Sequence, residues 1–445
     1  MVSKKNNKIG IIMSLVIVLI NILTIVLSWV VFSENGSFYR LFFITYRWIF
    51  IIYLVSLLFF SIIFDSFAFD RRKITENFYS ISLSNFISIC IFYFLDTLAF
   101  RSFDSPLYAL IAFVLIIIEN ITLCKVANYL SFLNYVPKKT IIFYKEDYDL
   151  VNIKKLTYFD IKYNVIQKIK KPVNADFDLD CDAVFLSGIE SSIRDTIIKN
   201  CIDKGIEAFI FPTVEDVIIA GGKYVEELSL PMIKINLSSI DFYYRVFKRL
   251  FDIVVSLVAL VLFSPFMLIT SILIKMYDGG PVLYKQVRLT KNRKKFTIYK
   301  FRSMKVDAEK DGIARISSKN DNRITPIGKI IRAIRFDELP QLFNILFGDM
   351  SIVGPRPERP EIAEQYEQQY PSFGLRLQVK AGLTGYAQVY GKYNSEPLDK
   401  LKMDLFYINN RSFLYDIKLC FMTIKILFMK ESTEAIDEGK ITADK

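Results

Sequence analysis

Two adjacent carboxylates, Asp337 and Glu338, are the side chains of this sequence best placed for polar chemistry. They stand just before Pro340 and a stretch, 339–346, in which apolar residues recur at helical spacing. Proline suits the first turn of a helix, so the pattern predicts that both acids lie at or just before a helix N-terminus. The partial positive charge of such a terminus favours an ionised carboxylate and attracts phosphate.

This placement indicates phosphoryl chemistry. An ionised Asp337 can attack phosphorus and form an aspartyl-phosphate type intermediate. Glu338 suits Mg²⁺, which binds a few carboxylates and completes its shell with substrate phosphate oxygens. The alternative is simple capping, because acids near a helix start stabilise it by about 0.3–1 kcal/mol.

Arg356 follows the two acids and stands between Pro355 and Pro357. The prolines fix the backbone on both sides and position the guanidinium. A planar fork held in place is what bidentate recognition of phosphate requires. The alternative is a solvated arginine in a proline-rich turn.

A basic run precedes these residues. Between positions 285 and 305 the sequence has nine basic residues and no acidic one: Lys285, Arg288, Lys291, Arg293, Lys294, Lys295, Lys300, Arg302 and Lys305. Such a run is often only a solvated face, but it can also bind anionic headgroups or a diphosphate. Nucleic acid is not favoured, because no helix-turn-helix or aromatic-interleaved pattern accompanies the run.

The composition excludes several classes of enzyme. There is no histidine in the 445 residues, which removes histidine bases, histidine metal ligands and serine–histidine nucleophile systems. The five cysteines form no CxxC pair, so buried thiols are more reasonable than a zinc site or disulfides. Hydrophobic residues make up 52% of the chain and the net charge is +11, as in a membrane protein with basic cytoplasmic faces.

Four apolar runs predict a membrane bundle over residues 1–130: Ile9–Phe32, Leu41–Phe64, Phe78–Phe100 and Pro106–Cys124. The basic residues that indicate the cytoplasmic side are Lys4, Lys5, Lys8, Arg71, Arg72, Lys73, Lys125, Lys138 and Lys139. The other two loops contain Arg40 and Arg101, partly offset by Glu34 and Asp104. Within the runs, Arg47, Asp96 and Glu119 mark either an ion path or residues that snorkel or pair.

Residues 140–236 predict a small parallel α/β domain. The expected strands and helix are Thr140–Tyr144, Ala183–Ser187, Ala208–Phe211 and Ser191–Asp203. The turn after the first strand has no glycine and contains Glu146 and Asp147, so we expect no dinucleotide there. For this α/β domain we expect a role in oligomerisation or control instead.

The apolar run Leu250–Met276 has basic flanks and contains Ser264-Pro265 at its middle. A helix that enters the membrane and turns back at this proline keeps both flanks inside, whereas a kinked full span is the alternative. Farther on, Leu414–Met429 is a candidate membrane-surface helix, and the charged tail 431–445 is expected to be flexible.

Six motifs stand in order along the last part of the chain: Lys248-Arg249-Leu250-Phe251-Asp252, Gly280-Pro281-Val282-Leu283-Tyr284-Lys285-Gln286, Tyr299-Lys300-Phe301-Arg302-Ser303-Met304, Asp337-Glu338-Leu339-Pro340-Gln341-Leu342, Gly354-Pro355-Arg356-Pro357 and Gly382-Leu383-Thr384-Gly385-Tyr386-Ala387-Gln388-Val389. Together they make residues 243–430 resemble the bacterial sugar transferases, which are monotopic polyprenyl-phosphate phosphoglycosyl transferases. The four runs and the α/β domain resemble the large form of that family. One departure is Thr290, where the family pattern has glycine.

The resemblance implies a fold of three parts. These are a membrane α-helical N-terminal bundle, a small α/β Rossmann-like domain at 140–236, and a mixed, mostly helical monotopic catalytic domain at 243–430. The last contains a re-entrant membrane helix at 249–276 that breaks at Ser264 and Pro265.

The resemblance also implies a reaction and its site. A UDP-sugar would give its sugar-1-phosphate to undecaprenyl phosphate and release UMP, as the first step of capsule or exopolysaccharide assembly. Asp337 would be the nucleophile, and Glu338 would hold Mg²⁺ together with Asp337. The residues expected to bind substrate or phosphate are Arg332, Arg356, Pro355, Pro357, Lys300, Arg302, Arg288 and Gln388.

The predicted setting is a multi-pass protein of the cytoplasmic membrane with its catalytic domain on the cytoplasmic face. Its partners would be a UDP-sugar, undecaprenyl phosphate and membrane lipids, without nucleic acid, and a homodimer is left open. A non-catalytic membrane scaffold or regulator with the same fold is the alternative. A transporter is less favoured, because the four runs show no repeat symmetry. The sequence does not identify the sugar.

Overall fold

The computed structural model describes residues 2–33, 44–100, 105–133, 135–172, 177, 179–227, 230–237, 242–306, 308, 323–391 and 396–427. The predictions for the loop charges Glu34, Arg40, Arg101 and Asp104 and for the tail 431–445 lie outside these residues. The chain divides into two compact units, Met1–Pro212 and Thr213–Lys445. Each unit is described by itself.

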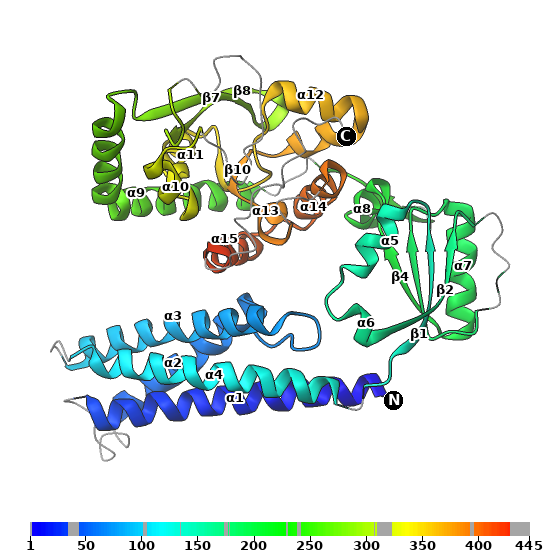
Figure 1. Cartoon of the computed structure of the whole chain (residues 1–445), viewed down its shortest axis with the longest axis horizontal. Helices are drawn as coiled ribbons and strands as arrows, with labels where there is room; N and C mark the ends of the chain where they lie inside the picture. Colours follow the sequence, from blue (N-terminus) through cyan, green and yellow to red (C-terminus); the bar gives the residue numbers. More distant parts are fainter. Residues whose placement is uncertain are drawn as a thin grey trace. The chain divides into compact units, whose positions relative to one another are not determined.

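The first unit begins with four long helices. They are α1 (Val2–Phe32), α2 (Ile44–Ile63), α3 (Ile74–Phe100) and α4 (Leu107–Phe132), drawn in blue to cyan in Figure 1. Aromatic side chains fill the space between them: Trp29, Tyr53, Phe92 and Tyr108 are almost fully buried. Three helices are long and apolar enough to cross a membrane, at Ile9–Phe32, Ile74–Ala99 and Leu107–Phe132, while α2 has the shorter apolar stretch Arg47–Ile63. The predicted bundle of four apolar helices is therefore present.

The acids inside the bundle have hydroxyl partners. Thr24 donates to both oxygens of Glu119 at 2.8 and 2.9 Å, and Tyr108 donates to Asp96 at 2.9 Å. Arg47 is exposed. These hydrogen bonds join α1 to α4 and α3 to α4, so they favour a structural role for the two acids over an ion path.

A parallel sheet follows the bundle in the first unit. Its strands are β1 (Lys138–Tyr144), β2 (Tyr163–Lys170), β3 (Ala183–Ser187) and β4 (Glu207–Phe211), in the order β2-β1-β3-β4. The helices are α5 (Asp147–Lys154), α6 (Phe159–Lys162) and α7 (Ser191–Lys204). The alternation of β1 explains the layers, because Ile141 and Phe143 pack toward α7 while Ile142 packs toward α5 and α6. The predicted parallel α/β arrangement is confirmed.

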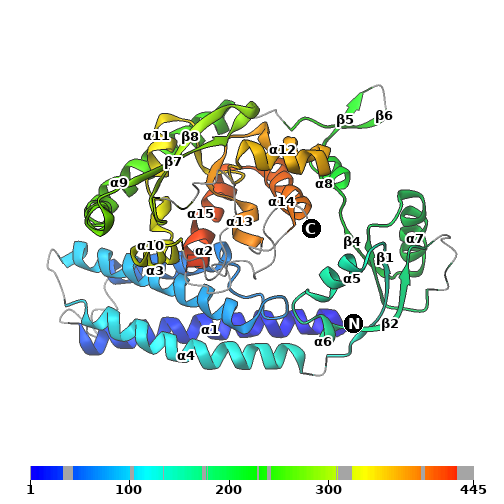
Figure 2. The same ribbon diagram turned by 45° about the horizontal axis from the view of Figure 1, so that its top comes forward.

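The second unit is mostly helical, with three two-stranded sheets. Its elements are α8 (Val214–Ala220), β5 (Lys223–Glu227), β6 (Leu230–Lys234), α9 (Phe242–Asp278), β7 (Leu283–Leu289), β8 (Lys295–Phe301), α10 (Pro326–Ala333), α11 (Gln341–Phe347), β9 (Ser351–Val353), α12 (Pro360–Gln369), β10 (Gly382–Thr384), α13 (Tyr386–Tyr390), α14 (Pro397–Asn410) and α15 (Phe413–Leu427). The pairs β5–β6 and β7–β8 are antiparallel (Figure 2), and β9–β10 is parallel. The helix α8 belongs to this unit, because Asn409 of α14 donates to the carbonyl oxygen of Val217 at 2.6 Å.

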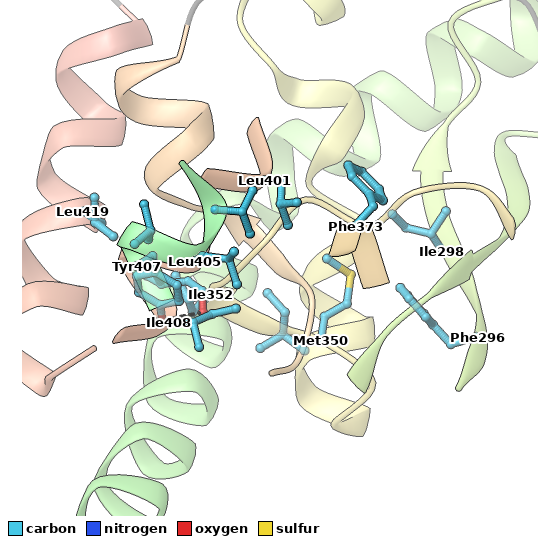
Figure 3. Packing of buried hydrophobic residues seen from close by; sticks show 14 of the residues in the cluster. Phe296, Ile298, Met350, Ile352, Phe373, Leu401, Leu405, Tyr407, Ile408 and Leu419 are labelled. Atoms are coloured by element: carbon cyan, nitrogen blue, oxygen red, sulfur yellow. Dashed lines mark hydrogen bonds between the residues drawn. The ribbon is translucent and has the colours of Figure 1, made fainter. Parts of the chain in front are cut away.

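The core of the second unit joins segments that are far apart in the sequence. Figure 3 shows Phe296 of β8 and Met350 next to Phe373, with Leu401 and Leu405 of α14 beside them. These side chains are buried almost completely. Their packing fixes β8, the loop before β9, and α14 as one body, which is the framework for the polar residues described below.

The helix α9 is continuous across Pro265 and is bent, as Figure 1 shows at the left of the second unit. A proline inside a helix leaves the carbonyl four residues earlier without its donor and is a usual cause of a kink. Here the hydroxyl of Ser264 donates to that carbonyl, the oxygen of Val261, at 2.8 Å. Most apolar side chains of α9 are exposed, including Leu262 and Phe266. An exposed apolar surface of this length is typical of a helix that lies in lipid.

The start of α9 is tied to the core by its charged motif. Lys248 lies 2.7 Å from buried Asp416 of α15, and Arg249 donates to the carbonyl oxygens at the end of α11, at 2.7 Å each. Asp252 accepts from the backbone of Ile352 at 3.0 Å. The basic and acidic residues of this motif therefore fix the apolar helix to the soluble core.

Candidate functional site

The two carboxylates lie in a short 3-10 turn, Phe336–Glu338, between α10 and α11. Arg335 opens the turn with the left-handed backbone φ of 59°, and Pro340 directly precedes the first residue of α11. The predicted helix after the acids is thus present. The acids lie before it in a buried turn and not on its first turn.

Glu338 is held by two cations. Its Oε1 lies 2.8 Å from Nζ of Lys300, on β8, and 3.0 Å from Nη2 of Arg356. Burial alone would raise the pKa of Glu338, but Lys300, Arg356 and Arg335 outweigh burial and hold this pKa well below its usual range. Glu338 is therefore a permanent anion in this site.

Asp337 has the opposite shift. Burial, and next the negative charge of Glu338, raise the pKa of Asp337, while Lys300, Arg332 and Arg335 act to lower it. Burial and Glu338 thus oppose the predicted ionisation of Asp337. The cations Lys300, Arg332 and Arg335 are the side chains that favour its anion. Two neighbouring carboxylates whose pKa values are pushed apart are typical of a site with divided chemical roles.

Arg376 fixes the loop that contains Arg356. This side chain is 4% exposed, its Nη2 donates to the backbone carbonyl of Arg356 at 3.0 Å, and its guanidinium pairs with Glu358 at 3.4 Å and Asp404 at 2.7 Å. Burial raises the pKa of Asp404 to about 6, although Arg376 acts to lower it. Arg376 was not identified from the sequence, because no local pattern connects it to positions 358 and 404.

We expect Arg376→Met to lower the free energy of unfolding by about 3–5 kcal/mol, because it leaves the buried carboxylate of Asp404 and the partly buried carboxylate of Glu358 without this cation. Chemical denaturation of the full chain in detergent measures this change. The matched control is Arg293→Met, since Arg293 pairs with Glu367 at 2.8 Å on the surface with 58% of its side chain exposed. That control should change stability by about 1 kcal/mol or less. Equal losses in the two variants would contradict the structural role of Arg376.

A polar pocket brings several predicted residues together. It is lined by Arg288, Ile298, Lys300, Glu338, Gln341, Arg356, Pro357 and Gly382. Arg288 donates to the carbonyl oxygen of Pro357 at 3.1 Å, and burial lowers its pKa to about 10. Pro355 belongs to the same loop and accepts from the backbone of Gly382 at 2.9 Å. The pocket is thus rich in cations and in N–H donors.

Other predicted residues lie elsewhere. Arg302 is buried, forms an ion pair with Asp278, and lines a separate small hollow near the end of α9. Gln388, on α13, donates to the carbonyl oxygen of Leu383 at 2.9 Å. Arg332 lies on α10 and acts on Asp337 through its charge. These three residues do not line the pocket around Glu338.

Thr290, the departure from the family pattern, has a structural role. It has the extended backbone φ of −127° and is buried. Its hydroxyl donates to the carbonyl oxygen of Asp349 at 2.9 Å and accepts from the backbone N–H of Ala381 at 3.1 Å. A glycine has no side chain to make these contacts, so in this chain the loop is fixed by a hydroxyl.

The carboxylates fit a metal only in part. Among the described residues, no cluster of three or more histidine, cysteine, aspartate or glutamate side chains is present. Asp337 and Glu338 supply oxygen ligands, and one oxygen of Glu338 already faces Lys300 and Arg356. Such a pair fits Mg²⁺, which retains waters and takes substrate phosphate oxygens, better than an ion that needs a full protein cage.

Comparison with known proteins gives one family. The family model described as bacterial sugar transferase matches residues 243–430. The exopolysaccharide production protein PSS of Rhizobium leguminosarum bv. phaseoli is 42% identical over 190 residues, which are 40% of this chain and 94% of that protein.

Two longer relatives are also similar. The UDP-N-acetylgalactosamine-undecaprenyl-phosphate N-acetylgalactosaminephosphotransferase of Aeromonas hydrophila is 42% identical over 187 residues, 41% of this chain and 44% of the relative. The UDP-glucose:undecaprenyl-phosphate glucose-1-phosphate transferase of Klebsiella pneumoniae is 37% identical over 254 residues, 55% of this chain and 54% of the relative. The match spans about half the length of these relatives.

Proposed function

The chain belongs to the bacterial sugar transferase family, and from this premise we propose that it transfers sugar-1-phosphate from a UDP-sugar to undecaprenyl phosphate, with release of UMP. The observation that carries the proposal is a pair of adjacent carboxylates, half-buried Asp337 and buried Glu338, beside a cationic pocket. Glu338 is fixed as an anion by Lys300 and Arg356, and Asp337 stands next to it. The names of two relatives support the donor and acceptor classes, and the name of a third supports a place in exopolysaccharide production.

The reaction has two balanced steps. A carboxylate oxygen of Asp337 attacks the β-phosphorus of the UDP-sugar, an O–P bond forms, and the bond from that phosphorus to the UMP oxygen breaks. A phosphate oxygen of undecaprenyl phosphate then attacks the phosphosugar on Asp337. The carboxylate leaves, and the product is a diphosphate-linked lipid sugar. Undecaprenyl phosphate is already an anion, so its attack needs little general-base help.

The residues of the pocket neutralise charge on the transferring group. Arg356, Lys300 and Arg288 offer N–H donors to phosphate oxygens, which is the main task in phosphoryl transfer. Asp337 and Glu338 would hold Mg²⁺, which supplies further neutralisation of the phosphate oxygens when it is bound.

A donor panel tests this function. The full chain in lipid nanodiscs is mixed with undecaprenyl phosphate, Mg²⁺ and either UDP-glucose or UDP-N-acetylgalactosamine, and UMP is measured. We expect UMP release with at least one UDP-sugar. Release of more than one UMP per chain should require the lipid phosphate. The competing hypothesis of a non-catalytic scaffold predicts no UMP above that of the Asp337→Asn variant with any UDP-sugar.

The ionisation of Asp337 sets the acid limb of the rate. The nucleophile acts as an anion, so activity falls as the pH decreases through its pKa, and a raised pKa puts this fall at a higher pH than for an ordinary aspartate. Arg332→Gln removes a charge that lowers this pKa and should move the acid limb of kcat/KM to still higher pH. The control Lys329→Gln, exposed on the same helix, should leave the limb in place. An unchanged limb in Arg332→Gln would count against Asp337 as the titrating group.

The bent helix α9 is the basis for a proposed membrane topology. Its exposed apolar surface and its bend support a re-entrant helix, which enters the membrane from the cytoplasmic side and has both ends on that side. Single-cysteine variants near Lys248 and Tyr277 should be labelled from the same side of the membrane. Pro265→Ala should straighten the helix and reduce activity. Labelling of the two positions from opposite sides would show a full span.

The sheet of the first unit is proposed to be a degenerate Rossmann-like domain with a role in assembly or control. The turn after β1 uses its own acids: the backbone of Glu146 donates to Asp149 at 2.9 Å, and Asp147 pairs with Lys170 at 2.8 Å. Carboxylates in this position repel a pyrophosphate, which supports the expectation of no dinucleotide. Calorimetry of the full chain with NAD tests it, and tight binding would refute it.

A further inference from the structure

The side chain of Gln341 is a buried polar group in the pocket around Glu338. It is 3% exposed, it lines the pocket with Glu338 and Arg356, and its Nε2 has no hydrogen-bond acceptor among the residues that the structure describes. A buried amide that is left unpaired costs free energy, and an apolar side chain of similar size would avoid this cost. The position therefore holds a donor that the folded protein itself does not use.

The polar groups around Gln341 define what can use that donor. Three cations, Arg288, Lys300 and Arg356, and one anion, Glu338, line the pocket. Their formal charges add to +2. Arg288 also has a buried Nε without an acceptor among the described residues. Because these unused groups are N–H donors, they fit an anion with several acceptor oxygens.

We propose that Gln341 is a ligand of the sugar-nucleotide donor, and that its Nε2 donates a hydrogen bond to a non-bridging oxygen of the diphosphate. This inference rests on the proposed function for the identity of the anion, and it adds a binding residue that charge alone would not reveal. Gln341 is three residues after Glu338 and opens α11, so the packed helix fixes the position of its backbone. A neutral amide contributes direction without adding charge, and it therefore orients the diphosphate that the cations attract.

The test compares Gln341→Leu, Gln341→Glu and the control Gln365→Leu in the full chain in lipid nanodiscs. Gln365 is an exposed glutamine on α12, outside the pocket. Calorimetry measures the affinity for inorganic diphosphate, which needs no turnover. Thermal unfolding measures stability, and UMP release with the UDP-sugar that the wild type uses gives kcat and KM.

We expect Gln341→Leu to weaken diphosphate binding and raise KM by about tenfold, with a thermal midpoint equal to or above that of the wild type. Gln341→Glu should bind diphosphate still more weakly, because a carboxylate cannot donate and repels the anion. Gln365→Leu should match the wild type in all three measurements.

Three results would overturn the inference. They are an affinity of Gln341→Leu within about twofold of the wild type, a thermal midpoint that falls together with its affinity, and a wild type that binds no diphosphate. If the wild type binds diphosphate but releases no UMP from any UDP-sugar, the proposed function fails. The comparison of diphosphate affinities then still decides the role of Gln341.

Discussion

Asp337→Asn reduces turnover by at least about 10⁴-fold if Asp337 is the nucleophile, because an amide oxygen does not form the phosphosugar intermediate. The substitution keeps the shape of the side chain. It should also leave the fold intact. The pKa of Asp337 is raised by burial, so the folded state favours its neutral form. The stability that comes from this shift is present below the pKa of the unfolded chain and is lost as the pH rises through the folded-state pKa. Above that folded-state pKa the ionised side chain costs stability, and the neutral amide removes that cost.

Intact-protein mass spectrometry is the decisive measurement. Wild-type protein mixed with UDP-sugar and Mg²⁺, without lipid phosphate, should gain the mass of one sugar phosphate and release one UMP per chain. Asp337→Asn should gain no mass and keep a normal thermal midpoint. If UMP appears only when both substrates are bound, and no adduct forms on the wild type, direct transfer is favoured and Asp337 is then a metal ligand.

Glu338→Gln should lower kcat by about 10²–10³-fold, a loss typical of removing one fixed electrostatic group from an active site. Glu338 is the anion that holds Lys300 and Arg356 at 2.8 and 3.0 Å, and a neutral amide binds both cations less firmly. The same change removes a negative charge that raises the pKa of Asp337. The residual activity should therefore have its acid limb at lower pH than the wild type.

The control for this prediction is Glu367→Gln, which breaks the exposed pair with Arg293 and should leave kcat and the acid limb unchanged. The acid limb should move to lower pH in Glu338→Gln and to higher pH in Arg332→Gln, since the two variants remove charges of opposite sign beside Asp337. If Glu338→Gln keeps the kcat of the wild type, the charge of Glu338 does not contribute to catalysis.

The features that could be predicted from the sequence depend on neighbouring residues. Apolar runs long enough to span a membrane predict the helices α1, α3 and α4 without any knowledge of their partners. The strand Ala183–Ser187 is a short apolar run, and it occurs as predicted. The edge strand β2 was not predicted, because lysine and glutamine interrupt the apolar residues of Tyr163–Lys170. Pairing with β1 makes this segment a strand.

The candidate site shows the same division. The adjacency of Asp337 and Glu338 and the prolines around Arg356 are visible in the sequence, because backbone stiffness and side-chain chemistry are local properties. The basic run between positions 285 and 305 is also visible, but the fold gives its members different partners, and Arg302 lies just beyond the end of β8. Lys300 lies beside Glu338, whereas Arg302 pairs with Asp278 in another part of the unit.

The sequence by itself therefore determined the kinds of chemical group, their order along the chain and the apolar segments that are long enough to cross a membrane. The tertiary structure decided which groups meet, and thereby the direction of each pKa shift. Burial and the adjacent Glu338 raise the pKa of Asp337, whereas Lys300 and Arg356, from distant segments, outweigh burial and lower the pKa of Glu338, although the two acids are neighbours in the chain. Arg376, from yet another segment, fixes the loop of Arg356. The physical reason is that electrostatic energies depend on distance and solvent exposure in three dimensions, and neither quantity is set by separation along the sequence.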